Sequence, residues 1–180
     1  HLANAGDVAS VAWLVTDEPM LAHHGLQATA IVSPCHEAGA VIFRAHDIAD
    51  QIETIYRATP DAGTSGMAVV FSAQAHESSR NLMANLTLSL NTLPAHCHQS
   101  AHRHNSAALT LVVAGHDCYS RVDGQTCPWT IGATLVTPAG AAHSHHNDGD
   151  ARAAFLIVQD GGLYYQARTM GFEFLAADAD

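Results

Sequence analysis

The sequence predicts an all-β fold, a sandwich or a barrel, from three observations. Short runs of β-forming residues recur along the chain, and turn residues separate them about every 8–12 positions. Asp123-Gly124 stands between two of these runs and is typical of a tight hairpin. In the first third of the chain, a single segment shows the spacing of an amphipathic helix.

The first part of the chain, residues 1–80, is expected to add strands and one short helix to a barrel formed by residues 81–180, within a single domain overall. Runs typical of strands cover residues 8–15, 27–33 and 39–44. Asp47 can cap the helix, whose apolar residues follow at i, i+4, i+7 and i+8, and Pro60 would end it.

The barrel region changes to a period of two. Over residues 82–91, leucines and an alanine alternate with mostly polar residues, as in a half-buried antiparallel strand. Further strands are expected at residues 108–113, 118–122, 126–130, 134–137 and 153–159. The tail, residues 162–175, could be a short helix or a strap across the sheet.

Composition favours an ordinary globular protein. Hydrophobic residues make up 48% of the 180 positions, and no apolar run approaches the roughly 18 residues that a membrane span needs. The net charge of −10 disfavours a nucleic-acid partner, and all seven basic residues are arginines. Four cysteines are too few for a disulfide framework, and no secretory signal is visible, so a cytoplasmic protein is expected.

Histidine is the unusual residue of this sequence, with 14 copies, eight of which lie between positions 96 and 146. That abundance is typical of a metal site or a proton-handling site. His102 and His104 are two positions apart, so on a strand both point to one face and can converge on one ion. Pro138 and Gly140 predict a tight turn that delivers His143 at the start of a later strand.

The residues around these histidines resemble the two signatures of the cupin superfamily. The second signature, Gly-x5-Pro-x-Gly-x2-His-x3-Asn, is matched at every defined position, by Gly132, Pro138, Gly140, His143 and Asn147. The first signature is matched by the His-x-His pair and by Gly115. It departs at two places: His96 replaces its leading glycine, and Ala108 or Leu109 stands where it has a metal-binding glutamate. The resemblance covers about residues 80–175 and implies a cupin double-stranded β-helix, a jelly-roll barrel of two antiparallel sheets.

Without that glutamate, the sequence is similar to the gentisate and salicylate 1,2-dioxygenase group. The run Ala101-His102-Arg103-His104 and the later Met170-Gly171-Phe172 look like that group. The resemblance implies that His102, His104 and His143 bind a divalent metal, with Fe(II) expected and Zn, Ni or Mn also suited to these ligands. It further implies a dioxygenase that uses O2 to cleave the ring of a hydroxylated aromatic carboxylate.

Beside the metal, His145 is expected to be the acid, base or substrate contact, because it shares a strand face with His143 while His146 points away. Leu109, Leu111 and Val113 are expected to form an apolar cavity wall. Because the chain has no lysine, a substrate carboxylate not bound to metal would need an arginine, a backbone donor or a neutral histidine.

Other functions stay open. A non-catalytic cupin that binds a metal or a small ligand has the same motif, and so does another three-histidine dioxygenase such as a thiol dioxygenase. Whether the chain is an active enzyme is also open, since well-known members of the group carry two cupin domains and this sequence shows one. Cupins commonly pair, and the apolar run at residues 8–15 is a suitable edge, so a homodimer is expected.

Several residues near the histidines have simpler expected roles. Cys97 is expected to be a small buried residue, and the same holds for Cys35. His96 and His98 are expected to be solvent-exposed, and Trp129 is expected to belong to the core. Arg103 is expected to take part in packing or in surface pairing. The amide of Asn147 is expected to tie a turn.

Overall fold

The structure is a computed structural model that describes residues 6–26, 41–58 and 67–176. They belong to two compact units, residues 1–34 and 35–180, and each unit is described by itself. The strand expected at residues 27–33, the first two residues of the one expected at 39–44, and Cys35 lie outside the described residues. Residues 41–44 are described and do not form a strand, so that prediction is wrong for this part of the segment. Within the described residues, no helix is long and apolar enough to cross a membrane.

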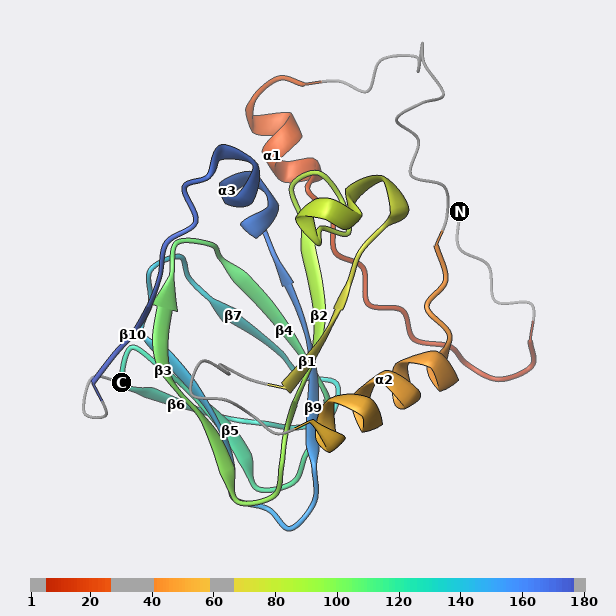
Figure 1. Ribbon diagram of the computed structural model, residues 1–180, viewed down its shortest axis with the longest axis vertical. Coiled ribbons are helices and arrows are strands. Elements are labelled where there is room, and N and C mark those ends of the chain that lie inside the picture. The colour runs from red at the N-terminus through yellow and green to blue at the C-terminus, as the bar shows by residue number, and fades with distance from the viewer. Residues whose placement is uncertain (1–5, 27–40, 59–66, 177–180) are drawn as a thin grey trace. The chain divides into compact units, whose positions relative to one another are not determined.

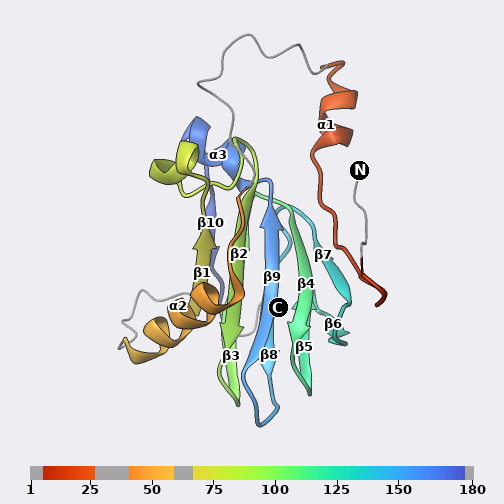
Figure 2. The same cartoon turned by 90° about the vertical axis from the view of Figure 1, so that its right-hand side faces the viewer.

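The larger unit consists mainly of two five-stranded antiparallel sheets (Figure 1). The first sheet has the order β1 (Met67–Phe71), β2 (Thr87–Leu93), β9 (Ala153–Gln159), β4 (Ala108–Ala114) and β7 (Thr134–Thr137). The second has the order β10 (Phe172–Phe174), β3 (Cys97–His104), β8 (His143–Asn147), β5 (Cys118–Val122) and β6 (Gln125–Pro128). The turned view shows the strands of the first sheet side by side, from β1 through β2, β9 and β4 to β7 (Figure 2). The predicted all-β fold is confirmed.

Sequence periodicity located most barrel strands well. The strands expected at 118–122, 134–137 and 153–159 have the predicted bounds. Asp123 and Gly124 form the tight turn between β5 and β6, with φ angles of 47° and 78°. The strand expected at 82–91 is shifted: β2 begins at Thr87, because the amides of Leu82 and Met83 both bond to the carbonyl of Leu86 and close a turn. The tail, residues 162–175, forms the helix α3 (Gly161–Ala167) followed by the strand β10.

The strand expected at residues 8–15 does not form. Val8, Val11 and Leu14 are 80%, 99% and 78% exposed, and none of the described residues pairs with this segment as a strand. An isolated apolar run gains neither burial nor ladder hydrogen bonds, so β-propensity alone does not make it a strand. The smaller unit instead contains the short helix α1 (Glu18–His23).

The predicted helix is present as α2 (Ala45–Arg57), but its ends differ from the expected ones. Arg44 is the N-cap residue, so Asp47 lies in the first turn, where a carboxylate still interacts favourably with the helix dipole. The helix packs on β1 and its neighbour β2, and the Tyr56 hydroxyl donates to Thr92 Oγ1 at 2.9 Å. A further short helix, η2 (Gln74–Ser79), follows β1.

The space between the sheets divides into a packed region and a cavity. The packed region is a cluster of Leu93, Val112, Cys118, Trp129, Ala153 and Phe155. The indole of Trp129 meets the ring of Phe155 edge-on, with centroids 4.9 Å apart, so its predicted place in the core is confirmed. The cavity has a volume of about 300 Å³ and contains the histidines of the predicted metal site in its lining.

Candidate metal centre

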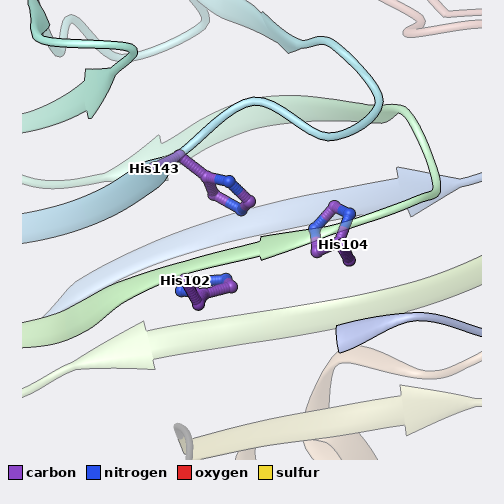
Figure 3. A group of neighbouring side chains, drawn as sticks. All are labelled: His102, His104 and His143. Carbon is purple, nitrogen blue, oxygen red and sulfur yellow. The ribbon is translucent and has the colours of Figure 1, made fainter. Parts of the chain in front are cut away.

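Three imidazoles from two neighbouring strands converge in the cavity. His102 and His104 lie two residues apart on β3, and His143 is the first residue of β8, paired with His102 in the strand register. All three side chains are buried, and their candidate ligand atoms lie within 4.8 Å of one another. The rings project into the same space (Figure 3). The chain thus places together the three residues expected to bind a metal.

Backbone contacts hold the loop before β8 in position. Gly140 adopts a φ of 79°, a conformation that costs glycine little, and its amide donates to the carbonyl of His104 at 2.8 Å. Ala142 exchanges two hydrogen bonds with the hairpin residue Asp123, one of them to the carboxylate at 2.9 Å. The turn therefore connects the ends of β3 and β5 to the residue just before His143.

Hydrogen bonds at Nδ1 determine which ring nitrogen each imidazole presents to the cavity. In all three rings, Nδ1 lies 2.8–2.9 Å from a backbone carbonyl oxygen. The three acceptors are the carbonyls of Ser100, Ser106 and Ala141. Because a carbonyl oxygen can only accept, Nδ1 carries the proton and the Nε2 lone pair is left for a ligand. The amide of Gln159, 3.3 Å from His104 Nε2, is a donor that suits this assignment.

Burial favours the neutral, metal-binding form of two of these rings, those of His102 and His143. Desolvation is the main cause that lowers the pKa of His102. Desolvation, followed by repulsion from His102, lowers the pKa of His143 to about 4. Metal binding requires neutral imidazoles, so near neutral pH these rings need no deprotonation to act as ligands.

His145 lies on the same strand face as His143, as its position two residues further along β8 predicts. The side chain lines the cavity but is 2% exposed, with its ring 5.9 Å from the His143 ring and packed against Trp129 and Phe155. Its Nδ1 lies 2.8 Å from the hydroxyl oxygen of Ser120. Burial holds the pKa of His145 well below its ordinary value. It is not part of the group whose nitrogens could share one ion.

The cavity wall differs from the expected one. Ala108 and Thr110 line the cavity, whereas Leu109 and Leu111 alternate to the other face of β4 and Val113 is 43% exposed. The expectation was wrong because it assigned the larger apolar residues of β4 to the cavity, whereas the cavity side of this strand carries Ala108 and Thr110. Ala108 is one of the two positions where the first cupin signature would have its glutamate, so the wall offers no carboxylate there.

The lining is polar but uncharged apart from its histidines. Its neutral polar side chains are those of Ser89, Asn91, Gln99, Thr110, Thr137, Gln159 and Tyr165. All seven arginines belong to the part of the chain that the structure describes, and none is among the lining residues. A ligand inside this cavity therefore meets no arginine or lysine of the described chain.

Histidines also occupy the outer face of the same sheet. His98 and His146 are cross-strand partners with stacked rings 5.7 Å apart, and Tyr119 stacks on His146 at 4.5 Å. His96 forms an ion pair with Asp150 at 3.0 Å, and both His96 and His98 are exposed, as expected. Cys97 is also exposed, which corrects the expectation of a buried thiol.

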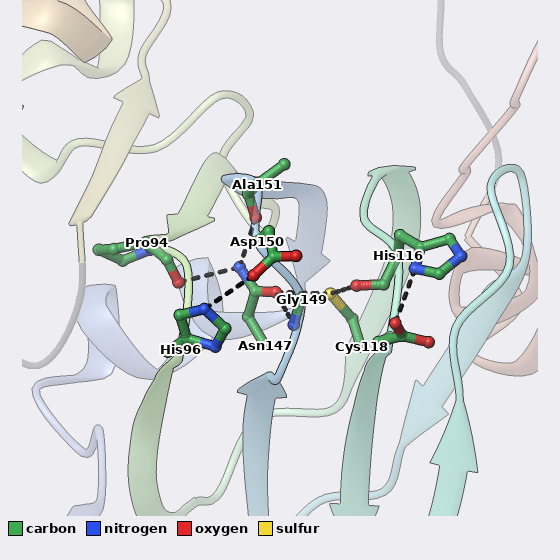
Figure 4. Close-up of polar contacts among 9 residues, drawn as sticks. Pro94, His96, His116, Cys118, Asn147, Gly149, Asp150 and Ala151 are labelled. Atoms are coloured by element: carbon green, nitrogen blue, oxygen red, sulfur yellow. Dashed lines mark hydrogen bonds and ion pairs between the residues drawn. The ribbon is translucent and has the colours of Figure 1, made fainter.

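Asn147 ties together the loops at one end of the second sheet (Figure 4). Its amide nitrogen donates to the carbonyls of Leu93, Pro94 and Ala151 at 2.9–3.1 Å. Its amide oxygen accepts from the backbone of Gly149 and from the thiol of Cys118. The side chain is 0% exposed, so the expected turn-tying role is confirmed.

His96, which replaces the leading glycine of the first signature, has a φ of 55°. Glycine adopts positive φ without the steric cost that a side chain brings, which explains a glycine at this place in the signature. Gly149 next to it is needed for a different reason, since a Cβ there would lie 2.2 Å from the carbonyl oxygen of His116.

Comparison with known proteins identifies the type of domain. Residues 90–159 match the family described as "Cupin domain". Gentisate 1,2-dioxygenase from Ralstonia sp. is 38% identical over 65 residues, which are 36% of this chain and 18% of that protein. 1-Hydroxy-2-naphthoate 1,2-dioxygenase from Nocardioides sp. (strain KP7) is 36% identical over 74 residues, 41% of this chain and 19% of that protein. The matches thus span about a fifth of these relatives.

A solved structure extends the likeness to the fold of nearly the whole chain. Salicylate 1,2-dioxygenase from Pseudaminobacter salicylatoxidans superposes with a TM-score of 0.72 at 18% identity, covering 91% of this chain and 49% of that one. The predicted cupin double-stranded β-helix is confirmed, and so is the resemblance to the gentisate and salicylate dioxygenase group.

Proposed function

We propose that this protein, which carries a cupin domain, is a metal-dependent dioxygenase that cleaves the ring of a hydroxylated aromatic carboxylate, with Fe(II) as its metal. The observation that carries the proposal is the group of three buried imidazoles whose Nε2 lone pairs share one space in the cavity. Relatives that match this region are named gentisate and 1-hydroxy-2-naphthoate 1,2-dioxygenases. The catalytic chemistry and the substrate class are inferred for this chain from its similarity to these relatives.

The donor set fits a divalent first-row metal. Imidazole nitrogens suit iron, nickel, copper and zinc, and three ligands on one side leave other positions free for small molecules. His102, His104 and His143 would hold the ion, and their carbonyl partners would keep the ring orientations. When bound, the metal supplies Lewis acidity toward the substrate oxygens and the redox chemistry that dioxygen needs.

The charge of the site favours a chelating acid. Three neutral imidazoles leave the ion its full positive charge, and the described lining contains no carboxylate and no arginine. The negative oxygens of a substrate are therefore best placed at the metal itself. An aromatic carboxylate with an ortho hydroxyl meets this condition, because both oxygens can bind one ion.

The protein's own contribution is positioning and the exclusion of water. A cavity of about 300 Å³ accommodates a single aromatic ring, and Ile157, Met170 and Phe172 offer apolar surface to its faces. Gln99, Thr110 and Gln159 offer neutral hydrogen bonds to ring substituents. His145, deeper in the wall, is proposed to contact a substrate oxygen.

The test loads the purified protein anaerobically with Fe(II) and adds gentisate, salicylate or 1-hydroxy-2-naphthoate while oxygen uptake and the ultraviolet spectrum are followed. Oxygen consumption with a ring-opened product supports the proposal. The matched controls are His104→Ala, which should abolish uptake, and His98→Ala on the outer face of the same strand, which should not. Stoichiometric iron with no uptake on any aromatic acid would contradict it.

A second candidate is a non-catalytic cupin that binds a metal or a small ligand. It rests on the same three buried imidazoles, which can hold a metal ion without catalysing a reaction. Metal at one equivalent, tight binding of an aromatic acid and no oxygen uptake would support this candidate.

A homodimer, a cytoplasmic location and a division of the chain between residues 80 and 81 stay predictions from the sequence.

A further inference from the structure

A buried hydrogen-bond chain runs behind His145. The indole Nε1 of Trp129 donates to the hydroxyl oxygen of Ser120 at 2.8 Å, and that oxygen lies 2.8 Å from His145 Nδ1. Ser120 is on β5, directly opposite His145 in the strand register, and Trp129 follows the end of β6. The Ser120 side chain is 0% exposed, and Trp129 is 9% exposed. The contact is therefore shielded from solvent on the side away from the cavity.

Counting protons sets the direction of both bonds. An indole N–H can only donate, so the Ser120 oxygen accepts from Trp129. The serine hydroxyl has one proton of its own, and His145 Nδ1 is its other hydrogen-bond partner among the described residues. If Nδ1 instead donated to the oxygen, the buried serine proton would have no acceptor, which is costly. Ser120 therefore donates to Nδ1, and the neutral ring carries its proton on Nε2.

This arrangement is the reverse of that in the three candidate ligands. Each of their Nδ1 atoms has a backbone carbonyl as acceptor, which leaves the lone pair on Nε2; the Ser106 hydroxyl also lies 3.0 Å from His104 Nδ1, but the carbonyl at 2.8 Å requires the proton on that nitrogen. The hydroxyl of Ser120 instead donates to Nδ1 of His145 and leaves an N–H on Nε2. A protonated Nε2 cannot bind a metal, so His145 is excluded as a fourth ligand although it lines the same cavity.

We propose that Ser120 and Trp129 are positioning residues that fix His145 as a neutral Nε2–H donor directed at an oxygen acceptor of the bound substrate. The assignment to a substrate oxygen rests on the proposed function, whereas the ring tautomer does not. In this tautomer His145 cannot remove a proton through Nε2, so its expected role is orientation and stabilisation of negative charge on an oxygen.

The tautomer is tested by nitrogen NMR on protein labelled with ¹⁵N-histidine, metal-free and loaded with Zn(II) as a diamagnetic probe. The His145 signals are assigned by their loss in His145→Gln. In the wild type, Nδ1 should show the shift of an unprotonated nitrogen and Nε2 that of a protonated one. The opposite pattern, with the proton on Nδ1, would overturn the proposal whatever the enzyme activity.

Variants then test the positioning roles. Ser120→Ala should leave His145 as a mixture of tautomers, Ser120→Thr should restore the fixed one, and Trp129→Phe should weaken the preference while keeping an aromatic ring in the core. The matched control is Ser144→Ala, because Ser144 is also a buried serine but contacts His146 on the other face. An unchanged His145 spectrum in Ser120→Ala would contradict the role of Ser120.

Ligand binding gives the second readout. Ser120→Ala should keep one equivalent of Zn(II) and weaken the binding of salicylate to the Zn(II)-loaded protein by about tenfold, the worth of one hydrogen bond. Wild-type salicylate affinity in Ser120→Ala, or loss of Zn(II), would contradict positioning of a substrate contact. If the tautomer is as proposed but no aromatic acid consumes oxygen, the proposed dioxygenase activity fails and the positioning result remains.

Discussion

Strands β3 and β8 carry histidines on both faces, and the two sets lie in opposite environments. On the cavity side, His102, His104, His143 and His145 are at most 8% exposed, and each has a specific partner at Nδ1. On the outer side, His98 and His146 stack on each other across the strands. The abundance of histidine alone therefore does not identify the site. The histidines of the site are identified by their burial and by a specific partner at Nδ1.

The largest expected effect is the loss of metal binding when an inward histidine is removed. His104→Ala should lower the affinity for Zn(II) or Fe(II) by more than about 100-fold, since changes to groups that only orient ligands already cost about 10–100-fold. His98→Ala, six residues earlier on the outer face, should leave it unchanged. Calorimetric titration of both variants measures the difference, and equal losses would remove the distinction between the faces.

The third inward residue of β8, Asn147, should affect the stability of the protein and not its affinity for metal. Asn147→Ala should lower the free energy of unfolding by about 3–4 kcal/mol, because it leaves several buried backbone groups without partners. Asn105→Ala is the control, since the exposed Asn105 amide makes two backbone contacts and its loss should cost about 1 kcal/mol. Urea denaturation measures both, and similar values would contradict the assignment.

Acid should destabilise the metal-free protein through the inward histidines. The folded-state pKa of His143 is about 4, below its ordinary 6.5, so only the unfolded chain binds this proton between these pH values. Stability is therefore retained above about pH 6.5 and lost as pH falls toward 4, by about 3 kcal/mol for this residue. In urea denaturation between pH 4 and 7, the free energy of unfolding should depend less steeply on pH in His143→Gln than in the wild-type protein.

The smallest effect is expected from the outward residue between the two ligands of β3. Arg103 pairs with Glu173 of β10 at the surface, where half of each side chain is exposed. Arg103→Ala should change the free energy of unfolding by less than about 1 kcal/mol and leave metal affinity unchanged. A loss of metal in this variant would mean that the outer face controls the site after all.

Sequence periodicity and motif spacing predicted most of the barrel strands and the strand face of the four inward histidines. They do not place His98, which lies on the outer face because the strand register shifts between Gln99 and His102. His102, His104, His143 and His145 turn inward because alternate residues of a strand share a face, which the chain determines locally. The sequence also showed that Ala108 departs from the signature, and the cavity wall has no carboxylate at that position. These features depend on neighbours a few positions apart.

Other features depended on which segments meet in space. The face of β4 that turns inward carries Ala108 and Thr110 and not the leucines, and residues 8–15, expected as a strand, are not paired as one in either described sheet. Ser120 and Trp129 were not recognised as partners of His145, because no local pattern links them to it.

The sequence alone established the cupin motif, the kinds of ligand atom and the positions of most of the barrel strands. The ring nitrogen that His145 presents depends on the folded structure, because the hydroxyl at its Nδ1 belongs to another strand, whereas the three ligand rings bond to carbonyls only two residues away in the chain. For His145, the hydroxyl comes from a strand 25 residues away in the chain. Strand periodicity and these short-range carbonyl contacts are local properties, whereas Ser120 and His145 meet only after β5 and β8 have paired.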